Sequence, residues 1–463
     1  MVRKLILPSA LILSLAAPAA LTAAAAAPAV PGALQTVEQR SSGQLSSGLP
    51  SPGQLSSGLL ASGQRPVEQR SVQAHPAGPR PAGQQARLTL PSPTGPHELG
   101  TVSLHLVDTS RPDPWVTTVP HRELMVSVVY PAVQAGRYPL APQLDPGTAV
   151  AFDTFTGNRN YGIPVGTVDW GATLTHAHRG APADTRGGPL PVVLYSPGGG
   201  DPRSWDTTLV EDLASRGYVV VTIDHTYESP AVRFPDDSVR TTVLTDELIQ
   251  KTIRDGGMQA LAQKTIDTRV ADTRFVLDRL ATPGTFPPDL AKLADLNRIG
   301  MFGHSAGGYT AAETMHDDKR IKAGVNMDGP LGTNLDDGGP NLAPVAVDGL
   351  DRPFLLMGSQ ASDHYTFRSW EAFWDNTPGW HRDLHLRGTK HGSYTDAEQL
   401  LPQIAQQTGL SADALQAEIG WSSPGPVLTA QQTYLAGFFD RWLKHRDAGL
   451  FDRPATSPGS FIP

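Results

Sequence analysis

The sequence contains no cysteine among its 463 residues. A chain without cysteine forms no disulfide bonds, so an exported form would depend on a large apolar core for its stability. The absence also excludes anchoring through a lipid-modified cysteine. Beyond the first 27 residues, no apolar run approaches the ~20 residues that a membrane-spanning helix needs. We therefore expect a folded body that is stable alone, with no integral membrane span in the mature protein.

The sequence also lacks a large excess of positive or negative charge. The 37 lysines and arginines and the 45 aspartates and glutamates give a net charge of −8 at pH 7. No segment gathers the positive charge that is typical of nucleic-acid-binding surfaces, so we expect no nucleic-acid partner. The sequence shows neither a cluster with metal-ligand spacing nor a glycine-rich nucleotide-binding motif, so we expect no metal and no organic cofactor.

The first 27 residues have the layout of a secretory signal peptide. Arg3 and Lys4 provide a positive start, Leu5–Leu21 is almost wholly apolar, and Ala23–Ala27 offers several small-residue cleavage sites. A membrane anchor is the alternative, but the apolar run is short for a span and is interrupted by two prolines. We predict that the protein is secreted and is extracellular after the signal peptide (residues 1–27) is cleaved.

Residues 28–86 are rich in serine, glycine, glutamine, proline and alanine. Val37–Ser41 recurs as Val67–Ser71, and the segment Ser41–Leu49 nearly repeats as Ser51–Leu59. Such a segment has too few large apolar side chains to offset the entropy that ordering would cost. We therefore assign residues 28–86 to a disordered linker and residues 87–463 to one folded domain.

In the folded domain, short apolar runs alternate with helical patterns. Continuous apolar strands separated by helices indicate a parallel sheet that is covered on both faces. The predicted fold class is α/β, with a mostly parallel central sheet, helices on both faces and an antiparallel N-terminal edge. The predicted strands are Gly100–Val107, Arg122–Tyr130, Leu190–Tyr195, Tyr218–Ile223, Arg298–Phe302, Ile321–Met327 and Pro353–Met357, and the predicted helices are Arg203–Arg216, Thr245–Arg279, Ala306–Met315 and Thr429–Arg446. Gln399–Gly420 indicates one or two further amphipathic helices, which either roof a pocket or cover the sheet.

Ser305 is the candidate nucleophile, in the run Gly303–Gly307 (GHSAG). A predicted strand ends just before this run, and a predicted helix begins just after Ser305. A sharp turn from strand to helix needs small residues two positions before and two after the serine, and it lifts the hydroxyl above the sheet edge. The helix N-terminus adds positive potential where negative charge develops during acyl transfer.

Stabilising that charge requires two backbone donors, which form an oxyanion hole. One is expected to be the N–H of Ala306, directly after the nucleophile. The other is expected from the glycine-rich loop Ser196–Gly200, which follows the predicted strand Leu190–Tyr195. Glycine lets the backbone of such a loop approach the substrate closely.

Six histidines follow Ser305 in the chain and could act as the general base: His316, His364, His381, His385, His391 and His445. His391 is best placed, because it follows a strand-like run and a turn, on a loop at the edge where Ser305 should lie. Its imidazole can accept the serine proton near neutral pH. Two residues compete for the acid that orients the base. Asp363 lies after Pro353–Met357, in the commonest position for this chain order, whereas Asp328 directly ends Ile321–Met327.

Eight short motifs between about Leu90 and Thr395 carry a resemblance to a known family. They are Thr94–Pro96, Leu99–Thr101, Val129–Pro131, Leu194–Gly198, Asp224–His225, Gly303–Gly308, Val325–Gly329 and Leu386–Gly388, which leads to His391. With them, the chain resembles the platelet-activating-factor acetylhydrolase family of α/β-hydrolases and its bacterial esterase relatives. The resemblance implies that Asp328 is the acid, and that the backbone N–H groups of Ala306 and Gly199 are the oxyanion donors. Family members tend to have histidine at the position of Pro197 and a bulky residue at that of Gly199, so the acetyl-specific pocket is not carried over.

The residues and the resemblance together predict a secreted serine hydrolase that cleaves carboxylic esters through an acyl-enzyme. Short-chain acyl esters are the expected substrates, with the acetyl or short acyl group of phospholipids among them. A secreted lipase, a polyester hydrolase or an acyltransferase could use the same residues. A non-catalytic binding protein is a further alternative, but a decayed site usually lacks one of its members, and serine, histidine and acid are all present.

Overall fold

The computed structural model describes residues 85–334, 341–452 and 461–462. The predicted signal peptide and residues 28–84 of the predicted linker lie outside the described residues. Ala86 is buried, and it pairs with Val168 through an isolated β-bridge. In the described part of the chain, no helix combines the length and the apolar character that crossing a membrane would require.

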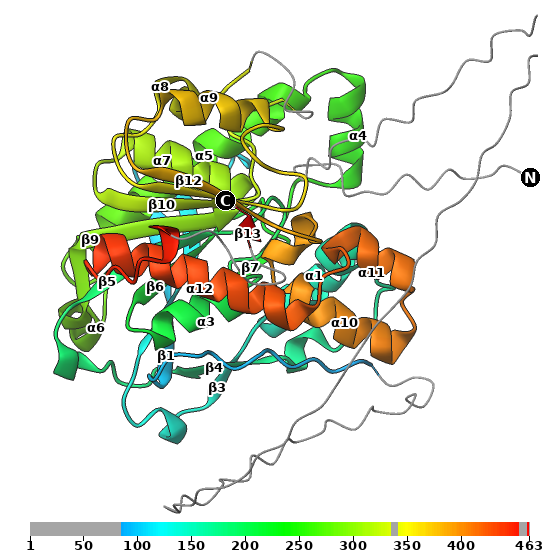
Figure 1. Ribbon diagram of the computed structural model, residues 1–463. Coiled ribbons are helices and arrows are strands. Elements are labelled where there is room, and N and C mark those ends of the chain that lie inside the picture. Colours follow the sequence, from blue (N-terminus) through cyan, green and yellow to red (C-terminus); the bar gives the residue numbers. More distant parts are fainter. Residues whose placement is uncertain (1–84, 335–340, 453–460, 463) are drawn as a thin grey trace, which may run out of the picture. The chain divides into compact units, whose positions relative to one another are not determined.

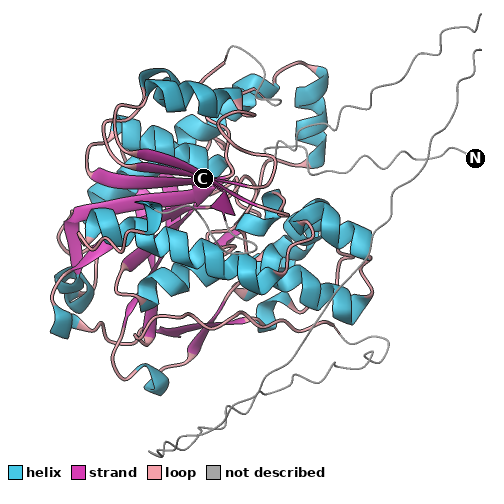
Figure 2. Ribbon diagram, viewed as in Figure 1, coloured by secondary structure: helices cyan, strands magenta, loops and turns pink. Residues whose placement is uncertain are grey.

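A twisted sheet forms the centre of the fold (Figures 1 and 2). Within the described residues it has eleven strands, in the order β13-β12-β11-β10-β9-β5-β6-β2-β1-β4-β3. Its strands are β1 Leu99–Asp108, β2 Arg122–Pro131, β3 Leu140–Pro142, β4 Leu174–Arg179, β5 Leu190–Ser196, β6 Val219–Asp224, β9 Ala294–His304, β10 Ile321–Met327, β11 Phe354–Gly358, β12 His381–Leu386 and β13 Phe461–Ile462. A separate hairpin pairs β7 Ala231–Arg233 with β8 Val239–Thr241.

The pairing of these strands confirms the predicted fold class. The six strands from β6 through β5, β9, β10 and β11 to β12 are parallel to one another, while β2 beside β6 and β13 beside β12 are antiparallel. At the N-terminal edge, β1 and β2 form the predicted antiparallel pair, in which Leu99 faces Pro131 and Asp108 faces Arg122. In the central strands β5 and β6, every residue except Leu190 is buried and most are β-branched or otherwise apolar, as expected for strands covered on both faces.

Helices cover both faces of the sheet (Figure 1). Side chains of α5, α6, α7, α8 and α9 pack in one core cluster, and side chains of α3 and α12 pack in a second cluster. The helices are α1 Pro146–Phe152, α2 Arg159–Tyr161, α3 Thr207–Ser215, α4 Asp246–Arg254, α5 Met258–Leu280, α6 Pro288–Leu293, α7 Ala306–Asp317, α8 Pro344–Asp348, α9 Arg368–Asn376, α10 Ala397–Thr408, α11 Ala412–Ile419 and α12 Pro424–Leu443, with shorter turns of helix at Ala135–Arg137, Asp153–Asn158, Trp170–Ala172, Thr185–Gly187, His391–Tyr394 and Leu450–Asp452.

The prediction of one helix over Thr245–Arg279 is wrong. The segment forms two helices, α4 and α5, which are separated at Asp255–Gly257. Gly256 has a φ of 70°, in the left-handed region that ends helices. The sequence carries a signal for this break, because consecutive glycines are typical of a turn, and Gly256 and Gly257 lie within it.

The segment Gln399–Gly420 contributes to two helices, α10 and α11, whose apolar side chains do not join the two sheet clusters. They form a third cluster with the insertion between β2 and β5 and with the start of the described chain. Its members include Leu400, Leu401, Ile404 and Ile419 from these helices, with Phe152, Trp170 and Trp205 opposite them. Helices α10 and α11 therefore rest on the insertion, whereas α12 packs on the sheet.

Candidate active site

Ser305 lies in the sharp turn between β9 and α7. It has a φ of 55° and a ψ of −120°, a conformation that non-glycine residues rarely adopt. Its amide donates a hydrogen bond to the carbonyl of Met327 at 2.8 Å, and its carbonyl accepts from the amide of Tyr309 at 3.1 Å. The strained turn is thus held on one side by β10 and on the other by the first turn of α7.

Gly307 shows why the residue two positions after the serine must be small. A Cβ atom at this position would lie 1.9 Å from the carbonyl oxygen of Ser196 and 2.6 Å from that of Pro197. Neither distance is possible for real atoms, and both obstacles are backbone. The end of β5, where the glycine-rich loop begins, is therefore packed directly against the start of α7.

Asp328 lies at the end of β10, the strand next to β9. In the register of these strands, Met327 faces His304, so Asp328 and Ser305 follow paired positions. One carboxylate oxygen, Oδ1, accepts the amide of Ser359 at 2.7 Å, and the other, Oδ2, lies 2.7 Å from Nδ1 of His391. Burial alone would raise the pKa of Asp328, but the hydrogen bonds from His391 and Ser359 reverse this effect and lower it. The carboxylate therefore faces His391 in its ionised form.

His391 begins the short helical turn His391–Tyr394, and its side chain is 20% exposed. Because Nδ1 faces the ionised Asp328, Nδ1 carries the hydrogen in the neutral ring, and Nε2 keeps a lone pair that can accept a proton. His304 supports this ring from behind: the two ring centres are 4.4 Å apart, and Nε2 of His304 lies 3.1 Å from the carbonyl oxygen of His391. Burial is the main cause that lowers the pKa of His304, and the nearby His391 lowers it further. The pKa therefore lies well below its usual value, and His304 stays neutral.

The structure places the competing acid elsewhere. Asp363 accepts the amides of Tyr365 and Thr366 through Oδ1 at 3.0 and 2.8 Å and so caps a turn before α9. Two of the other candidate histidines also have carboxylate partners of their own. His364 contacts Asp383 at 2.7 Å, and His316 contacts Asp317 and Asp348. Geometry thus brings Asp328 and His391 together at the elbow, while their catalytic roles stay predictions.

The loop that holds Gly199 follows β5, which lies beside β9 in the sheet. In this register Ser196 faces Gly303, so Gly199 and Ala306 follow neighbouring strands at the same sheet edge. Next to the loop, burial raises the pKa of Asp201 to about 7, although the positive charges of Arg269 and His391 act to lower it. On α11, burial likewise raises the pKa of Glu418 to about 7, and His391 opposes this shift. Neither acid is among the residues predicted from the sequence, although Asp201 directly follows the glycine run.

A second serine, histidine and aspartate form a chain of hydrogen bonds next to the loop. Oγ of Ser196 lies 3.0 Å from Nε2 of His225, and Nδ1 of His225 lies 3.0 Å from Oδ2 of Asp272. All three residues are 0% exposed. Burial and then the charge of Arg269 lower the pKa of His225, so its ring stays neutral. No substrate can reach this buried set, and its hydrogen bonds join β5, β6 and α5.

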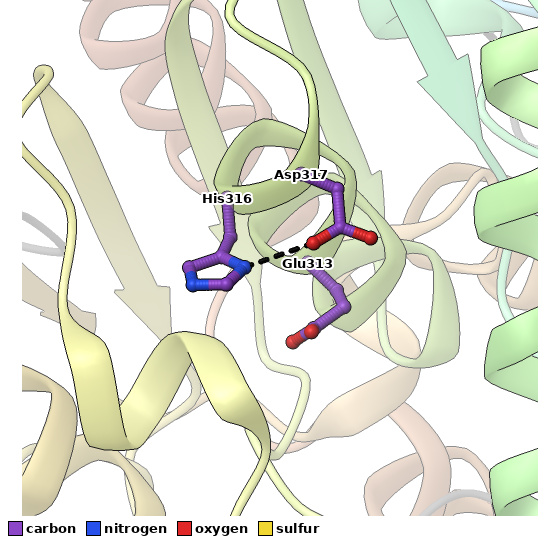
Figure 3. Close-up of side chains that lie close together, drawn as sticks. All are labelled: Glu313, His316 and Asp317. Atoms are coloured by element: carbon purple, nitrogen blue, oxygen red, sulfur yellow. Dashed lines mark hydrogen bonds and ion pairs between the residues drawn. The ribbon is translucent and has the colours of Figure 1, made fainter.

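One group of metal-ligand side chains occurs among the described residues, at the far end of α7 from Ser305. One ligand atom from each of Glu313, His316 and Asp317 lies within 4.8 Å of the others (Figure 3). The contacts of these side chains are structural: His316 reaches Asp348 at the end of α8 at 3.1 Å, and Glu313 accepts the amide of Val345 in α8 at 3.2 Å. The group therefore joins α7 to α8.

A cavity of about 500 Å³ lies beside Pro202 and Arg203, between α3 and the strands β1, β2 and β6. Its lining includes none of the candidate catalytic residues. Arg203 in its wall is already paired with Asp224 and donates to the hydroxyl of Ser127 at 2.7 Å. The cavity is thus separate from the site at the elbow.

Comparisons with known proteins find acetylhydrolases and esterases. The profile of a family described as platelet-activating factor acetylhydrolase, isoform II, matches residues 150–282. A probable 1-alkyl-2-acetylglycerophosphocholine esterase from Arthroderma benhamiae is 26% identical over 386 residues, which cover 79% of this chain and 91% of that protein. The platelet-activating factor acetylhydrolase of Cavia porcellus is 26% identical over 34% of this chain and 39% of its own length. Among solved structures, a ferulic acid esterase from Streptomyces cinnamoneus is 33% identical with a TM-score of 0.62, and the match covers 80% of this chain and 96% of that one.

Proposed function

The chain belongs to the platelet-activating-factor acetylhydrolase-like family of α/β-hydrolases and is a carboxylic ester hydrolase, and we propose that Ser305, His391 and Asp328 are its catalytic triad. The observation that carries this proposal is the 2.7 Å contact between Nδ1 of His391 and the buried carboxylate of Asp328, beside the strained Ser305. Such a contact fixes the ring in the tautomer whose Nε2 can take the serine proton.

In the proposed reaction, Oγ of Ser305 attacks the ester carbonyl while its proton moves to Nε2 of His391. The carbonyl oxygen becomes an oxyanion, which the N–H groups of Ala306 and Gly199 hold. The imidazolium then protonates the leaving alcohol as the acyl-enzyme forms, and Asp328 stabilises the charge on the ring. Water, activated by the same histidine, releases the acid and restores Ser305.

Short-chain acyl esters are the substrates that we propose. The curated relative from Arthroderma benhamiae is named for an acetyl ester of a glycerophosphocholine, which supports a short acyl group. A second substrate class, esters of ferulic acid, follows from the Streptomyces cinnamoneus esterase, whose identity to this chain is higher and whose length is almost fully matched. A lipase, polyester hydrolase or acyltransferase activity on the same triad would be distinguished by chain length and by the acceptor of the acyl group.

A substrate series tests the proposal. We expect the highest kcat/KM for p-nitrophenyl acetate or butyrate, a much lower value for the palmitate, and labelling of the wild-type protein by a fluorophosphonate. Highest rates on the palmitate would favour a lipase, and highest rates on methyl ferulate would favour the ferulic ester class. A wild-type protein that is not labelled would contradict the triad.

We also propose that the protein is exported, on the strength of the signal-peptide pattern in residues 1–27. Expression of the full chain in a bacterial host with a secretory pathway should yield a product in the medium whose N-terminus lies near residue 28. A product retained in the cell with an intact N-terminus would contradict export.

A further inference from the structure

Arg269 is a fully buried arginine that the proposed reaction does not use. It lies in the middle of α5 and is 1% exposed. Buried arginines require partners for their five N–H donors, because an unpaired guanidinium in the interior is costly. Apart from the carboxylate of Glu228, the partners of Arg269 lie on one short segment of the chain, from the end of β5 into the glycine-rich loop.

Two neighbouring carbonyls of this loop accept from the guanidinium. Nη1 of Arg269 donates to the carbonyl of Pro197 at 2.5 Å, and Nη2 donates to the carbonyl of Gly198 at 3.0 Å. On its other edge, Nε donates to Oε1 of Glu228 at 2.7 Å, and Glu228 is itself 0% exposed. The planar fork thus binds two successive peptide groups, while a buried carboxylate balances its charge.

Peptide geometry links these contacts to the oxyanion hole. In a planar trans peptide, the C=O of one residue and the N–H of the next point in opposite directions. The carbonyl of Gly198 is directed at Arg269, so the N–H of Gly199 is directed away from Arg269. Holding that carbonyl therefore fixes the direction of the very N–H that is proposed to bind the oxyanion.

The other side of the loop is bounded by the nucleophile elbow. A Cβ on Gly198 would lie 2.9 Å from Nδ1 of His304 and 2.6 Å from Oδ2 of Asp201. The carbonyl oxygens of Ser196 and Pro197 occupy the place of a Cβ on Gly307, as described above. The loop is confined between the elbow and Arg269, and a small displacement of Arg269 would leave the loop supported on one side only.

Arg269 also contacts the buried serine–histidine–aspartate set, through Ser196. Nη1 of Arg269 lies 3.4 Å from Oγ of Ser196, which contacts His225, and His225 contacts Asp272 one turn further along α5. Asp272 accepts in turn from Arg122 at 2.7 Å and from Arg111 at 2.6 Å. Helix α5 therefore provides both Arg269 and Asp272, the carboxylate member of the buried set.

We propose that Arg269 is a positioning residue, which sets the direction of the oxyanion-binding N–H of Gly199 by holding the carbonyls of Pro197 and Gly198. This role rests on the proposed function of Ser305, His391 and Asp328. Because Arg269 acts through the backbone of Gly199, its removal should weaken binding of the transition state more than binding of the substrate.

Arg269→Lys is the first test, because it keeps a positive charge opposite Glu228 and removes the planar fork. We expect kcat to fall by about 10- to 100-fold with KM nearly unchanged, since complete loss of an oxyanion donor costs about 10²–10³ in kcat. The affinity for a short-chain trifluoromethyl ketone should fall by the same factor. Ser305 adds to this ketone to give an oxyanion, whereas the ester ground state has none.

Arg352→Lys is the matched control. Arg352 also holds backbone carbonyls with its fork, at 3.1 Å for Asp318 and 2.6 Å for Ile321, but it does so away from the elbow. The control should lose thermal stability and keep kcat and ketone affinity. If both variants changed kcat and ketone affinity alike, the specific role of Arg269 would be contradicted.

The double variant Arg269→Met with Glu228→Met covers the case in which Arg269→Lys fails to fold. Replacing both members of a buried ion pair by apolar side chains is often tolerated. The double variant should show the same selective loss of kcat and of ketone affinity.

If the wild type reacts with fluorophosphonate and either variant keeps full kcat, the role of Arg269 is contradicted while the proposed triad stands. A wild type that does not react would contradict both.

Discussion

Two sets of serine, histidine and aspartate lie close together in this fold, and they differ in access and in charge. In the elbow set, the His391 side chain is 20% exposed, and its aspartate, Asp328, binds that histidine, the amide of Ser359 and the side chain of Ser362, with no arginine among these partners. In the buried set, Ser196, His225 and Asp272 are 0% exposed. Identical residue types therefore form the proposed catalytic triad in one place and hold the backbone in the other.

The surroundings of the two histidines explain the difference. A general base must become charged during the reaction, which needs a stabilising carboxylate and room for the substrate. His225 has a carboxylate partner, but burial and the charge of Arg269 lower its pKa and oppose protonation. Asp272 is shared with Arg122 and Arg111, so its charge is already balanced by arginines. A histidine beside an aspartate becomes a base only where the protein leaves that charge available.

The largest expected effect separates the two serines. Ser305→Ala should lower kcat by about 10⁶-fold and abolish labelling by a fluorophosphonate, because the nucleophile is lost. Ser196→Ala should keep both labelling and kcat, and it should lose on the order of 1 kcal/mol of stability through the missing bond to His225. Esterase assays and mass spectrometry of the labelled protein measure both outcomes. Labelling that persists in Ser305→Ala and disappears in Ser196→Ala would reverse the assignment of the two sets.

The next effect separates the aspartates that could serve His391. Asp328→Asn should lower kcat by about 10⁴-fold, because an amide at this position stabilises the wrong tautomer of the ring. Asp363→Asn is the matched control and should leave kcat unchanged, since Asp363 caps a local turn. Steady-state kinetics on p-nitrophenyl butyrate measure both variants. A large loss in Asp363→Asn alone would move the acid to the later strand.

These comparisons show which parts of the site could be predicted from the sequence. The elbow at Ser305 is a local feature: a buried strand, small residues at fixed spacing and a helix start all fall within about ten residues. The choice between Asp328 and Asp363 is not local, because both follow buried strands, and only the resemblance to a family favoured Asp328. The fold class was predictable because buried parallel strands have continuous apolar runs.

Arg269 and the buried set could not be predicted in this way. Their contacts join α5 to a loop about seventy residues earlier in the chain, and no periodic pattern encodes such a pairing. Charged residues in α5 suggest an exposed face by composition, yet Arg269 and Asp272 are both buried.

The third effect should appear in stability and not in catalysis. Asp272→Asn removes the carboxylate that pairs with the buried Arg122, and breaking such a pair typically costs about 3–5 kcal/mol. Urea unfolding should show this loss, while kcat per folded molecule stays near the wild-type value. Asp295→Asn, which breaks a half-exposed pair with Arg298, is the control and should cost about 0–1 kcal/mol. Equal losses in the two variants would mean that the buried set adds no more stability than a surface pair.

The smallest effect is a pH dependence that belongs to His225. Its pKa in the folded protein lies below the ordinary value near 6.5, so the fold favours the neutral ring, which contacts Asp272 and Ser196 with Arg269 and Glu228 nearby. As the pH falls through about 6.5, the unfolded chain binds a proton at His225 and the folded protein does not, so this group contributes less stability at pH 5 than at pH 8.

His225→Gln cannot titrate, so the stability difference between wild type and this variant should be largest at pH 8. It should shrink progressively at pH 6.5 and pH 5, because only the unfolded wild-type chain takes up a proton at His225 there. Urea unfolding of both proteins at pH 8, 6.5 and 5 measures this difference and cancels the titration of all other groups. A difference that stays constant with pH would mean that His225 is as easily protonated in the fold as outside it. The contrast between His391, the proposed base, and the buried His225 would then have to rest on access to solvent and substrate alone.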